Sequence, residues 1–205
     1  PKVPRVDLKR RYELITTIGQ GSMSQVWRAR DPKTGNTYAI KILDKKKTKQ
    51  LDDRFAMRGL IRPTEGEVAI QLVDPHIVHT YEYGWSVDNE MFLVMDFVEG
   101  VGLSFLVDTQ NETLRSNRLR LIIELGQAIE YFHSRNFIHR DICPRNVLLD
   151  EDHRIKLIDF GLVVPNTPEF QQPGNRTGTM AYMAPELLKR QQTDQRIDIF
   201  SYAMS

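Results

Sequence analysis

The stretch "FIHRDICPRNVLLD", residues 137–150, places Asn146 five residues after Asp141. A second motif, "IKLIDFG" at residues 155–161, places Asp159 at the end of an apolar run. Magnesium prefers hard oxygen ligands, which Asn146 and Asp159 can supply, and a further aspartate beside a hydroxyl can accept its proton. Each of these residue types is also common in turns, so the functional hypothesis depends on the order and spacing of the motifs.

Toward the N-terminus, residues 18–26, "IGQGSMSQV", place a Gly-x-Gly turn between two predicted strands. Such a turn lets the backbone approach a phosphate, although a plain hairpin needs glycines too. The turn lacks the strand-to-helix context of a Rossmann fingerprint and the Gly-Lys-Ser/Thr ending of a P-loop. Lys41 ends the apolar strand "YAIK"; it is either a surface lysine or an ammonium paired with a phosphate or a carboxylate. Glu65 and Glu67 on the next predicted helix both qualify as that carboxylate.

Hydrophobic periodicity divides the chain into two halves. Alternating apolar residues and turn signals predict five strands, at residues 12–19, 24–31, 37–43, 76–85 and 90–98. Residues 44–62 give no clear pattern, whereas Pro63 and Thr64 indicate a helix start that puts Glu65 in the first turn. After Gly100 we predict a long helix at 113–135, a hairpin from 146–150 and 155–160, a long loop at 161–184, and helix beginnings at 186–191 and 197–205. The sequence therefore predicts an α+β protein.

Charge and composition exclude several classes of protein. The 205 residues include 28 Lys and Arg against 27 Asp and Glu, a balance that gives no global field for nucleic acid or a membrane. We expect the basic run at residues 45–49 to be a solvated loop or helix end. One cysteine, no visible signal peptide and apolar runs too short to cross a bilayer predict a soluble, cytoplasmic protein. The chain opens with Pro1, not Met, so we expect sequence upstream.

In combination, the motifs resemble the eukaryotic-type protein kinase family from about residue 12 to the end of the chain. The residues that carry the resemblance occur in the family's order: Gly19-x-Gly21, Ala39-Ile40-Lys41, His139-Arg140-Asp141, Asn146, Asp159-Phe160-Gly161, Ala184-Pro185-Glu186 and Asp198. The resemblance implies a two-lobed α+β fold. Residues 1–11 would be an N-terminal extension, residues 12–98 an N-lobe with an antiparallel five-stranded sheet plus one helix, and residues 99–205 a partial, mainly helical C-lobe.

The resemblance also implies binding of ATP with Mg²⁺. Lys41 would hold the α- and β-phosphates, oriented by Glu65, which we prefer to Glu67 on the spacing before Pro75. The loop over the phosphates would comprise Gly19, Gln20, Gly21, Ser22 and the residues up to Val26. The adenine pocket would comprise Ile18, Val26, Ala39 and Leu148 around the ring, Met95 at its back, and backbone groups of Asp96 and Val98 at its edge.

For catalysis, the resemblance implies that Asp141 orients and deprotonates the hydroxyl of a protein substrate. Asn146 and Asp159 would hold Mg²⁺, since phosphoryl transfer depends on positioning and charge neutralisation. The leading hypothesis is an ATP-dependent serine/threonine protein kinase. The alternative is a pseudokinase, a nucleotide-binding or scaffolding module without turnover. A small-molecule kinase is disfavoured by the Ala-Pro-Glu segment, which binds peptide in the family.

One departure from the family pattern bears on catalysis. Cys143 stands where similar serine/threonine kinases have Lys, and a neutral thiol cannot hold the transferring phosphate as an ammonium does. Arg145 is the candidate to supply that charge. Tyrosine kinases place an Arg similarly, whereas Gly178 and Thr179 resemble serine/threonine kinases, which we favour. Cys143 could also be a reactive thiol, although an inert small residue is the simpler interpretation.

The end of the chain, "RIDIFSYAMS", resembles the opening of the central C-lobe helix of the family. In the family, further helices pack on that helix and pair with the Glu of Ala-Pro-Glu, here Glu186. We therefore expect the chain to be a C-terminally truncated fragment of a longer gene product, in which activity could be impaired.

Overall fold

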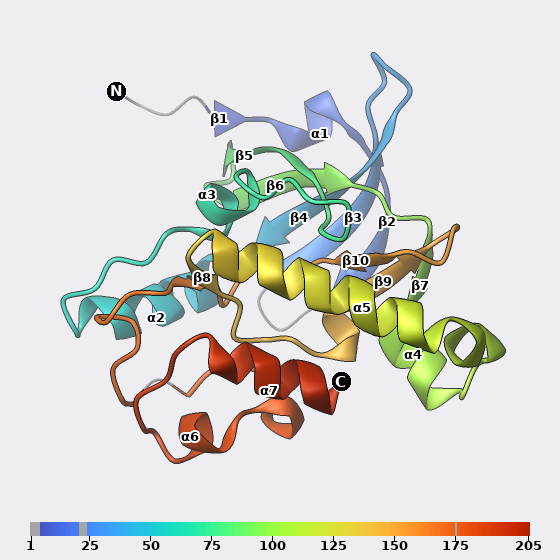
Figure 1. The fold of residues 1–205 in the computed structure, drawn as a ribbon. Coiled ribbons are helices and arrows are strands. Elements are labelled where there is room, and N and C mark those ends of the chain that lie inside the picture. The colour runs from blue at the N-terminus through green and yellow to red at the C-terminus, as the bar shows by residue number, and fades with distance from the viewer. Residues whose placement is uncertain (1–4, 21–23, 175) are drawn as a thin grey trace. The chain divides into compact units, whose positions relative to one another are not determined.

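A computed structural model describes residues 5–20, 24–174 and 176–205 (Figure 1). The chain forms two compact units. The first unit comprises Pro1–Leu72 and His79–Phe97, and the second comprises Val73–Val78 and Val98–Ser205. The polypeptide therefore crosses between the units after residues 72, 78 and 97. The α+β class predicted from the sequence is confirmed.

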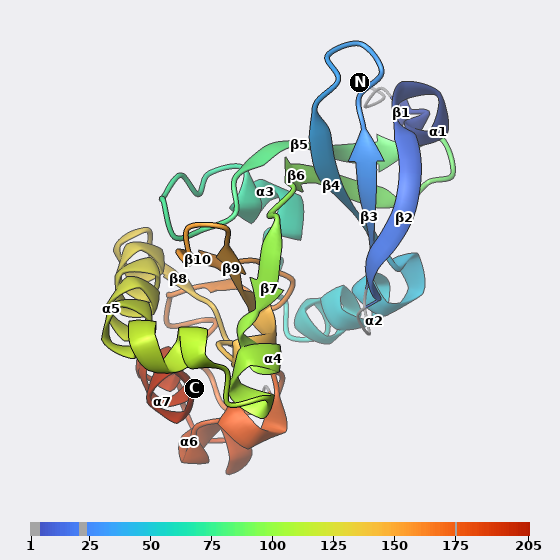
Figure 2. The ribbon, with the colours of Figure 1, turned by 90° about the vertical axis from the view of Figure 1, so that its right-hand side faces the viewer.

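The first unit is built on a six-stranded sheet with the strand order β1-β5-β6-β4-β3-β2 (Figure 2). Its elements are β1 (Arg5–Val6), α1 (Leu8–Arg11), β2 (Glu13–Gln20), β3 (Ser24–Arg30), β4 (Thr37–Leu43), α2 (Lys45–Ala56), α3 (Glu65–Ala69), β5 (Thr80–Ser86) and β6 (Met91–Asp96). The five strands predicted from alternation are all present. Burial follows alternation only in part, since the first five residues of β6 are all buried.

The sheet is larger than the sequence predicts, because the N-terminal segment contributes a sixth strand. β1 pairs in parallel with β5, through Arg5 opposite Trp85, so the sheet is mixed and not wholly antiparallel. The following residues, Leu8 and Tyr12, are buried in an apolar cluster of that sheet. Arg11 adds a two-bonded ion pair to Glu82, with both N–O distances at 2.7 Å. Residues 5–11, which were expected to belong to an N-terminal extension, thus contribute to the sheet and core of the first unit.

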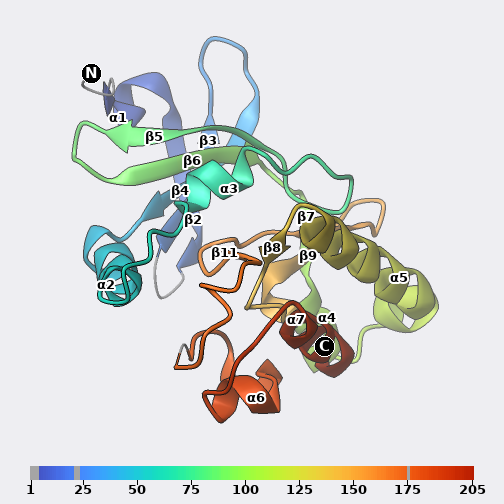
Figure 3. The ribbon, with the colours of Figure 1, turned by 60° about the vertical axis from the view of Figure 1, so that its left-hand side comes forward.

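Three helices occur in the first unit where one was expected, and two of them flank an irregular segment (Figure 3). Residues 44–62 gave no pattern because α2 buries only two of its apolar side chains, Leu51 and Phe55, among many charges. The Asp44 carboxylate caps α2 by accepting from the backbone N–H groups of Lys46 and Lys47. α3 begins at Glu65, as Pro63 and Thr64 predict, but ends after five residues.

The second unit is mainly helical, with two small sheets in the orders β10-β9-β7 and β11-β8. Its elements are β7 (Gly100–Gly102), α4 (Leu103–Asp108), α5 (Glu112–Ser134), β8 (Phe137–Ile138), a 3-10 turn (Pro144–Asn146), β9 (Val147–Asp150), β10 (Ile155–Leu157), β11 (Val164–Pro165), a second 3-10 turn (Met180–Tyr182), α6 (Pro185–Leu188) and α7 (Arg196–Met204). The predicted hairpin is β9 with β10. The predicted long helix is α5, whose buried apolar side chains are Leu121, Leu125, Ala128, Ile129 and Phe132. Within the described part of the chain, no helix is long and apolar enough to cross a bilayer.

The inserted segment Val73–Val78 is bound to β10 by backbone hydrogen bonds. The Leu157 N–H donates to the His76 carbonyl at 2.8 Å, and the Val78 N–H donates to the Leu157 carbonyl at 3.0 Å. Ile77 and Leu157 form a parallel bridge. Because both backbone groups of Leu157 are satisfied by this segment, it is an integral part of the second unit.

Candidate active site

A buried ion pair joins two elements of the first unit. Lys41 lies in β4, and its Nζ is 2.5 Å from Oε1 of Glu65 in α3. Only 7% of the Lys41 side chain and 5% of the Glu65 side chain are exposed. Breaking a buried ion pair by removing one partner is strongly destabilising, so this contact helps to hold both side chains in place. Of the two candidate carboxylates, Glu65 makes this contact, while Glu67 bonds to Thr64.

Cross-strand pairing brings several of the other nucleotide candidates together in the first unit. Gly19 lies opposite Val26, and Val26 lies opposite Lys41. Ala39 lies opposite Met95, and both are buried. These residues therefore lie on four adjacent strands of one sheet, β2, β3, β4 and β6.

The remaining nucleotide candidates are more scattered. Ile18 in β2 is 47% exposed. Gly21, Ser22 and the side chain of Gln20 lie outside the described residues. Leu148 lies in β9, opposite Gly102, and with Val98 it belongs to the second unit.

Two hydrogen bonds hold Asp96, which lies at the end of β6. Its backbone N–H donates to the His79 carbonyl at 3.0 Å, and its Oδ1 accepts from the Tyr81 hydroxyl at 2.6 Å. This hydrogen bond to a carboxylate favours the neutral phenol and raises the pKa of Tyr81 to about 12. The phenol therefore stays protonated and continues to donate at neutral pH.

Asp141 of the second unit has its carboxylate fixed by three donors. Oδ1 accepts from the backbone N–H and the hydroxyl of Thr179, each at 2.7 Å. Oδ2 accepts from Nδ2 of Asn146 at 3.0 Å. The same Nδ2 donates to the Asp141 carbonyl at 2.8 Å, so Asn146 is anchored on the residue it orients. The three donors leave the carboxylate one preferred orientation.

Asn146 and Asp159 suit a magnesium ion by their chemistry. Both described hydrogen bonds of the Asn146 side chain use its amide nitrogen, which directs the amide oxygen, a hard ligand, away from them. Asp159 accepts from the Gly161 N–H at 3.0 Å through Oδ1. Among the described residues, no group of three or more His, Cys, Asp or Glu side chains could hold a metal. A magnesium ion bound here would thus need phosphate and water oxygens as well, which is its usual coordination.

The backbone before Asp141 is held by a fully buried carboxylate on α7. Asp198 accepts from the N–H groups of His139 and Arg140, both at 2.8 Å, and bonds to Nε2 of His133 at 2.9 Å. Arg140 has φ of +71°, a left-handed conformation that is uncommon outside glycine. Asp198 therefore stabilises a strained segment whose next residue is Asp141.

Two further features shape this segment. Burial lowers the pKa of His139, which keeps the ring neutral where it packs against Phe132 and Phe160. Gly178 has φ of +118°, and a Cβ there would lie 2.5 Å from the Arg140 carbonyl oxygen. Only glycine permits that approach, which places Thr179 against Asp141.

Arg145 and Cys143 both reach the hydroxyl of Thr179. Nη2 of Arg145 donates to Oγ1 at 3.1 Å, and Sγ of Cys143 lies 3.7 Å from the same oxygen. Arg145 is exposed, whereas only 1% of Cys143 is exposed. The guanidinium thus brings positive charge beside the Asp141 site, where the cysteine brings none.

Cys143 is expected to be a poor nucleophile in the folded protein. Burial, and secondarily the negative charge of Asp141, raise the pKa of its thiol above 9.0. Alkylation by iodoacetamide at pH 7.5 should therefore be at least about tenfold slower in the native chain than in the chain in 6 M guanidinium, followed by mass spectrometry. Equal rates in the two states would contradict the assignment of Cys143 as an inert, packed residue.

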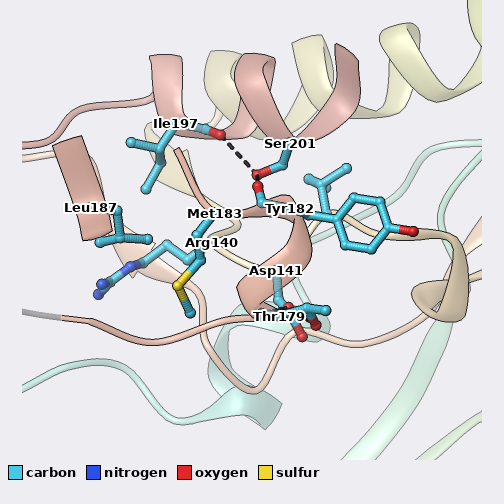
Figure 4. A pocket seen from close by; sticks show the side chains of 9 residues that line it. Arg140, Asp141, Thr179, Tyr182, Met183, Leu187, Ile197 and Ser201 are labelled. Atoms are coloured by element: carbon cyan, nitrogen blue, oxygen red, sulfur yellow. Dashed lines mark hydrogen bonds between the residues drawn. The ribbon is translucent and has the colours of Figure 1, made fainter. Parts of the chain in front are cut away.

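A narrow recess lies beside Asp141 in the second unit (Figure 4). Its lining residues are Arg140, Asp141, Ile142, Thr179, Tyr182, Met183, Leu187, Ile197 and Ser201. The Ser201 hydroxyl of α7 donates to the Tyr182 carbonyl at 2.7 Å and contacts the Ile197 carbonyl at 2.9 Å. The recess is too small to enclose a water molecule, so we assign it to the packing of α7 and not to a ligand.

Two structural roles at the site were not predicted from the sequence. The supporting role of Asp198 gives no local signal, because its partners lie 58 and 59 residues away along the chain. The capping box between Thr64 and Glu67 does have a signal, the Thr-x-x-Glu spacing ahead of an apolar pair, and could have been found.

Comparison with known proteins is consistent with this geometry. Residues 12–205 match the family model described as "Protein kinase domain". The chain is 29% identical to serine/threonine-protein kinase PknE of Mycobacterium bovis, over 93% of this chain and 33% of that protein. It is 31% identical to serine/threonine-protein kinase PknH of Mycobacterium tuberculosis, over 94% of this chain and 30% of that protein. It is 34% identical to CBL-interacting serine/threonine-protein kinase 20 of Arabidopsis thaliana, over 95% and 43% respectively. The chain thus spans less than half the length of these relatives.

Proposed function

The chain belongs to the protein kinase family, and from that premise we propose that it transfers the γ-phosphate of ATP to Ser or Thr hydroxyls of protein substrates. The observation that carries the proposal is the Asp141 carboxylate, held by the Thr179 N–H, the Thr179 hydroxyl and the Asn146 amide. A carboxylate in one fixed orientation suits a residue that must align a hydroxyl and take its proton.

In the proposed reaction, Asp141 accepts the proton of the substrate hydroxyl as its oxygen attacks the γ-phosphorus. The bond from that phosphorus to the β,γ-bridging oxygen breaks, and ADP leaves. Lys41, oriented by Glu65, binds the α- and β-phosphates. Arg145 offsets charge near the transferring group, where Cys143 cannot. Asn146 and Asp159 would hold Mg²⁺, which when bound neutralises phosphate charge.

Serine and threonine are the proposed acceptors for two reasons. The relatives described above are named serine/threonine-protein kinases. Thr179, which resembles the threonine of that class, makes two bonds to Asp141. Arg145 is the feature that tyrosine kinases share, and here it is bound to the same Thr179 hydroxyl.

Phosphate transfer to generic substrates tests the proposal. The chain would be incubated with radiolabelled ATP, Mg²⁺ and either myelin basic protein or a Glu-Tyr copolymer, followed by phosphoamino-acid analysis. We expect phosphoserine and phosphothreonine and no phosphotyrosine. Nucleotide binding without transfer to either substrate would contradict the proposal and favour a nucleotide-binding scaffold.

A further inference from the structure

The helix that carries Glu65 is unusually dependent on its surroundings. α3 comprises five residues, and Glu65 is the first of them. A helix of five residues has no stability of its own, because nucleation costs more than so few hydrogen bonds return. The direction of the Glu65 side chain toward Lys41 is therefore set by the contacts that fix the first turn of α3.

One of those contacts is a complete capping box. The Thr64 hydroxyl accepts from the Glu67 N–H at 3.2 Å, and Oε2 of Glu67 accepts from the Thr64 N–H at 2.7 Å and from its hydroxyl at 2.9 Å. The Thr64 carbonyl accepts the first helical bond, from Val68 at 3.1 Å. Thr64 thus accepts from two backbone N–H groups that follow Glu65, those of Glu67 and Val68, and so helps to determine where Glu65 enters the helix.

Close packing holds the next residue against the sheet. A Cβ on Gly66 would lie 2.4 to 2.7 Å from the ring and Cβ of Tyr83 in β5. Since no other side chain fits there, α3 lies directly on Tyr83 at this point. This contact limits the distance of α3 from the sheet, and the cap adds hydrogen bonds that hold its first turn.

A half-buried ion pair, in which the Asp52 side chain is 47% exposed, anchors the approach to Thr64. Nε of Arg62 is 2.8 Å from Oδ1 of Asp52 in α2, and only 4% of the Arg62 side chain is exposed. The Arg62 guanidinium also lies over the Phe55 ring, 6.0 Å from its centroid. The irregular segment between α2 and α3 (Figure 3) is therefore fixed two residues before the cap.

We propose that Thr64 is a positioning residue for the Lys41–Glu65 pair. Its hydroxyl sets the first turn of α3, and loss of that hydroxyl lets Glu65 leave Lys41 while the rest of the first unit stays folded. The inference rests on the proposed function only where it concerns phosphoryl transfer; the coupling of the cap to α3 stands on the contacts alone.

The test compares Thr64→Val, which keeps the branched shape and removes the hydroxyl, with Thr64→Ser, which keeps the hydroxyl. Loss of an N-cap side chain shifts the equilibrium between the formed and the unformed helix by about fivefold. We expect kcat/KM for ATP to fall about fivefold in Thr64→Val and to stay within about twofold of wild type in Thr64→Ser. Asn111→Ala is the matched control, because Asn111 caps α5 in the second unit by accepting from the Thr113 N–H at 2.9 Å. The Asn111→Ala variant should lose about as much free energy of unfolding as Thr64→Val and keep the wild-type kcat/KM.

A double-mutant cycle separates positioning from general destabilisation. If Thr64 acts through Glu65, Thr64→Val should lower kcat/KM no further in a Glu65→Gln background. A further fivefold loss in that background would overturn the proposal, as would an unchanged kcat/KM in Thr64→Val alone.

Hydrogen exchange gives a readout that does not require turnover. The amide protons of Glu67, Val68 and Ile70 should exchange about fivefold faster in Thr64→Val than in wild type, and at the wild-type rate in Asn111→Ala. If wild type transfers no phosphate, the proposed function fails, and hydrogen exchange alone then tests the role of Thr64. Unchanged exchange in Thr64→Val would then overturn the role of Thr64.

Discussion

Asp141→Asn is expected to lower the rate of phosphoryl transfer by about 10²- to 10⁴-fold, the range that a general base contributes. The amide is nearly the same size as the carboxylate but cannot take the proton of the substrate hydroxyl at neutral pH. In either orientation its nitrogen would face a donor, from Thr179 or from Asn146, so at least one hydrogen bond of the site would be lost. The rate is measured with radiolabelled ATP and a protein substrate, and nucleotide affinity by titration calorimetry.

Nucleotide affinity should change little in Asp141→Asn, because the proposed phosphate and metal contacts come from Lys41, Asn146 and Asp159. Asp152→Asn, the same chemical change on an exposed turn, is the control and should keep the wild-type rate. A transfer rate in Asp141→Asn within about threefold of wild type would refute the assignment of Asp141 as the base.

Asp198→Ala should destabilise the second unit by roughly 3–5 kcal/mol, the cost of removing one partner from a buried charged network. The substitution leaves the N–H groups of His139 and Arg140 without their acceptor and removes the restraint on the left-handed backbone at Arg140. Unfolding in urea should be followed by circular dichroism at 222 nm. Fluorescence is unsuitable, since both tryptophans, Trp27 and Trp85, belong to the first unit.

Asp53→Ala provides the comparison for that experiment. Asp53 forms an exposed pair with Lys49 one turn away in α2, and such pairs contribute below about 0.5 kcal/mol. A loss of stability in Asp198→Ala no larger than in Asp53→Ala would mean that the carboxylate on α7 does not hold the segment before Asp141.

The sequence was most informative where a regular pattern extends over many residues. The residue pattern and flanking turn signals of β3 and β4 and the helical spacing in α5 predict those elements to within a residue or two, and α5 buries a repeating face. β1 was missed because two residues carry no periodicity and their pairing with β5 is made through the backbone. α2 was missed because Leu51 and Phe55 alone do not outweigh its charges.

At the candidate site, the sequence identified the reactive residues better than the contacts that orient them. The order of short motifs brought forward Lys41, Asp141 and Asn146, since the chemistry of phosphate transfer constrains their identity. The contacts that orient them depend on distant residues. The hydrogen bond from the Arg140 N–H to Asp198 cannot be read from a local pattern, because it joins segments 58 residues apart.

The insertion of Val73–Val78 into the second unit limits how this protein can be dissected. A gene fragment ending after residue 97 would carry away the segment that pairs with β10. The complementary fragment would then expose Leu157 with an N–H and a carbonyl that had lost their partners, along an open strand edge. Such edges recruit strands from neighbouring molecules, so the C-terminal fragment expressed alone should self-associate unless residues 73–78 are grafted back onto it.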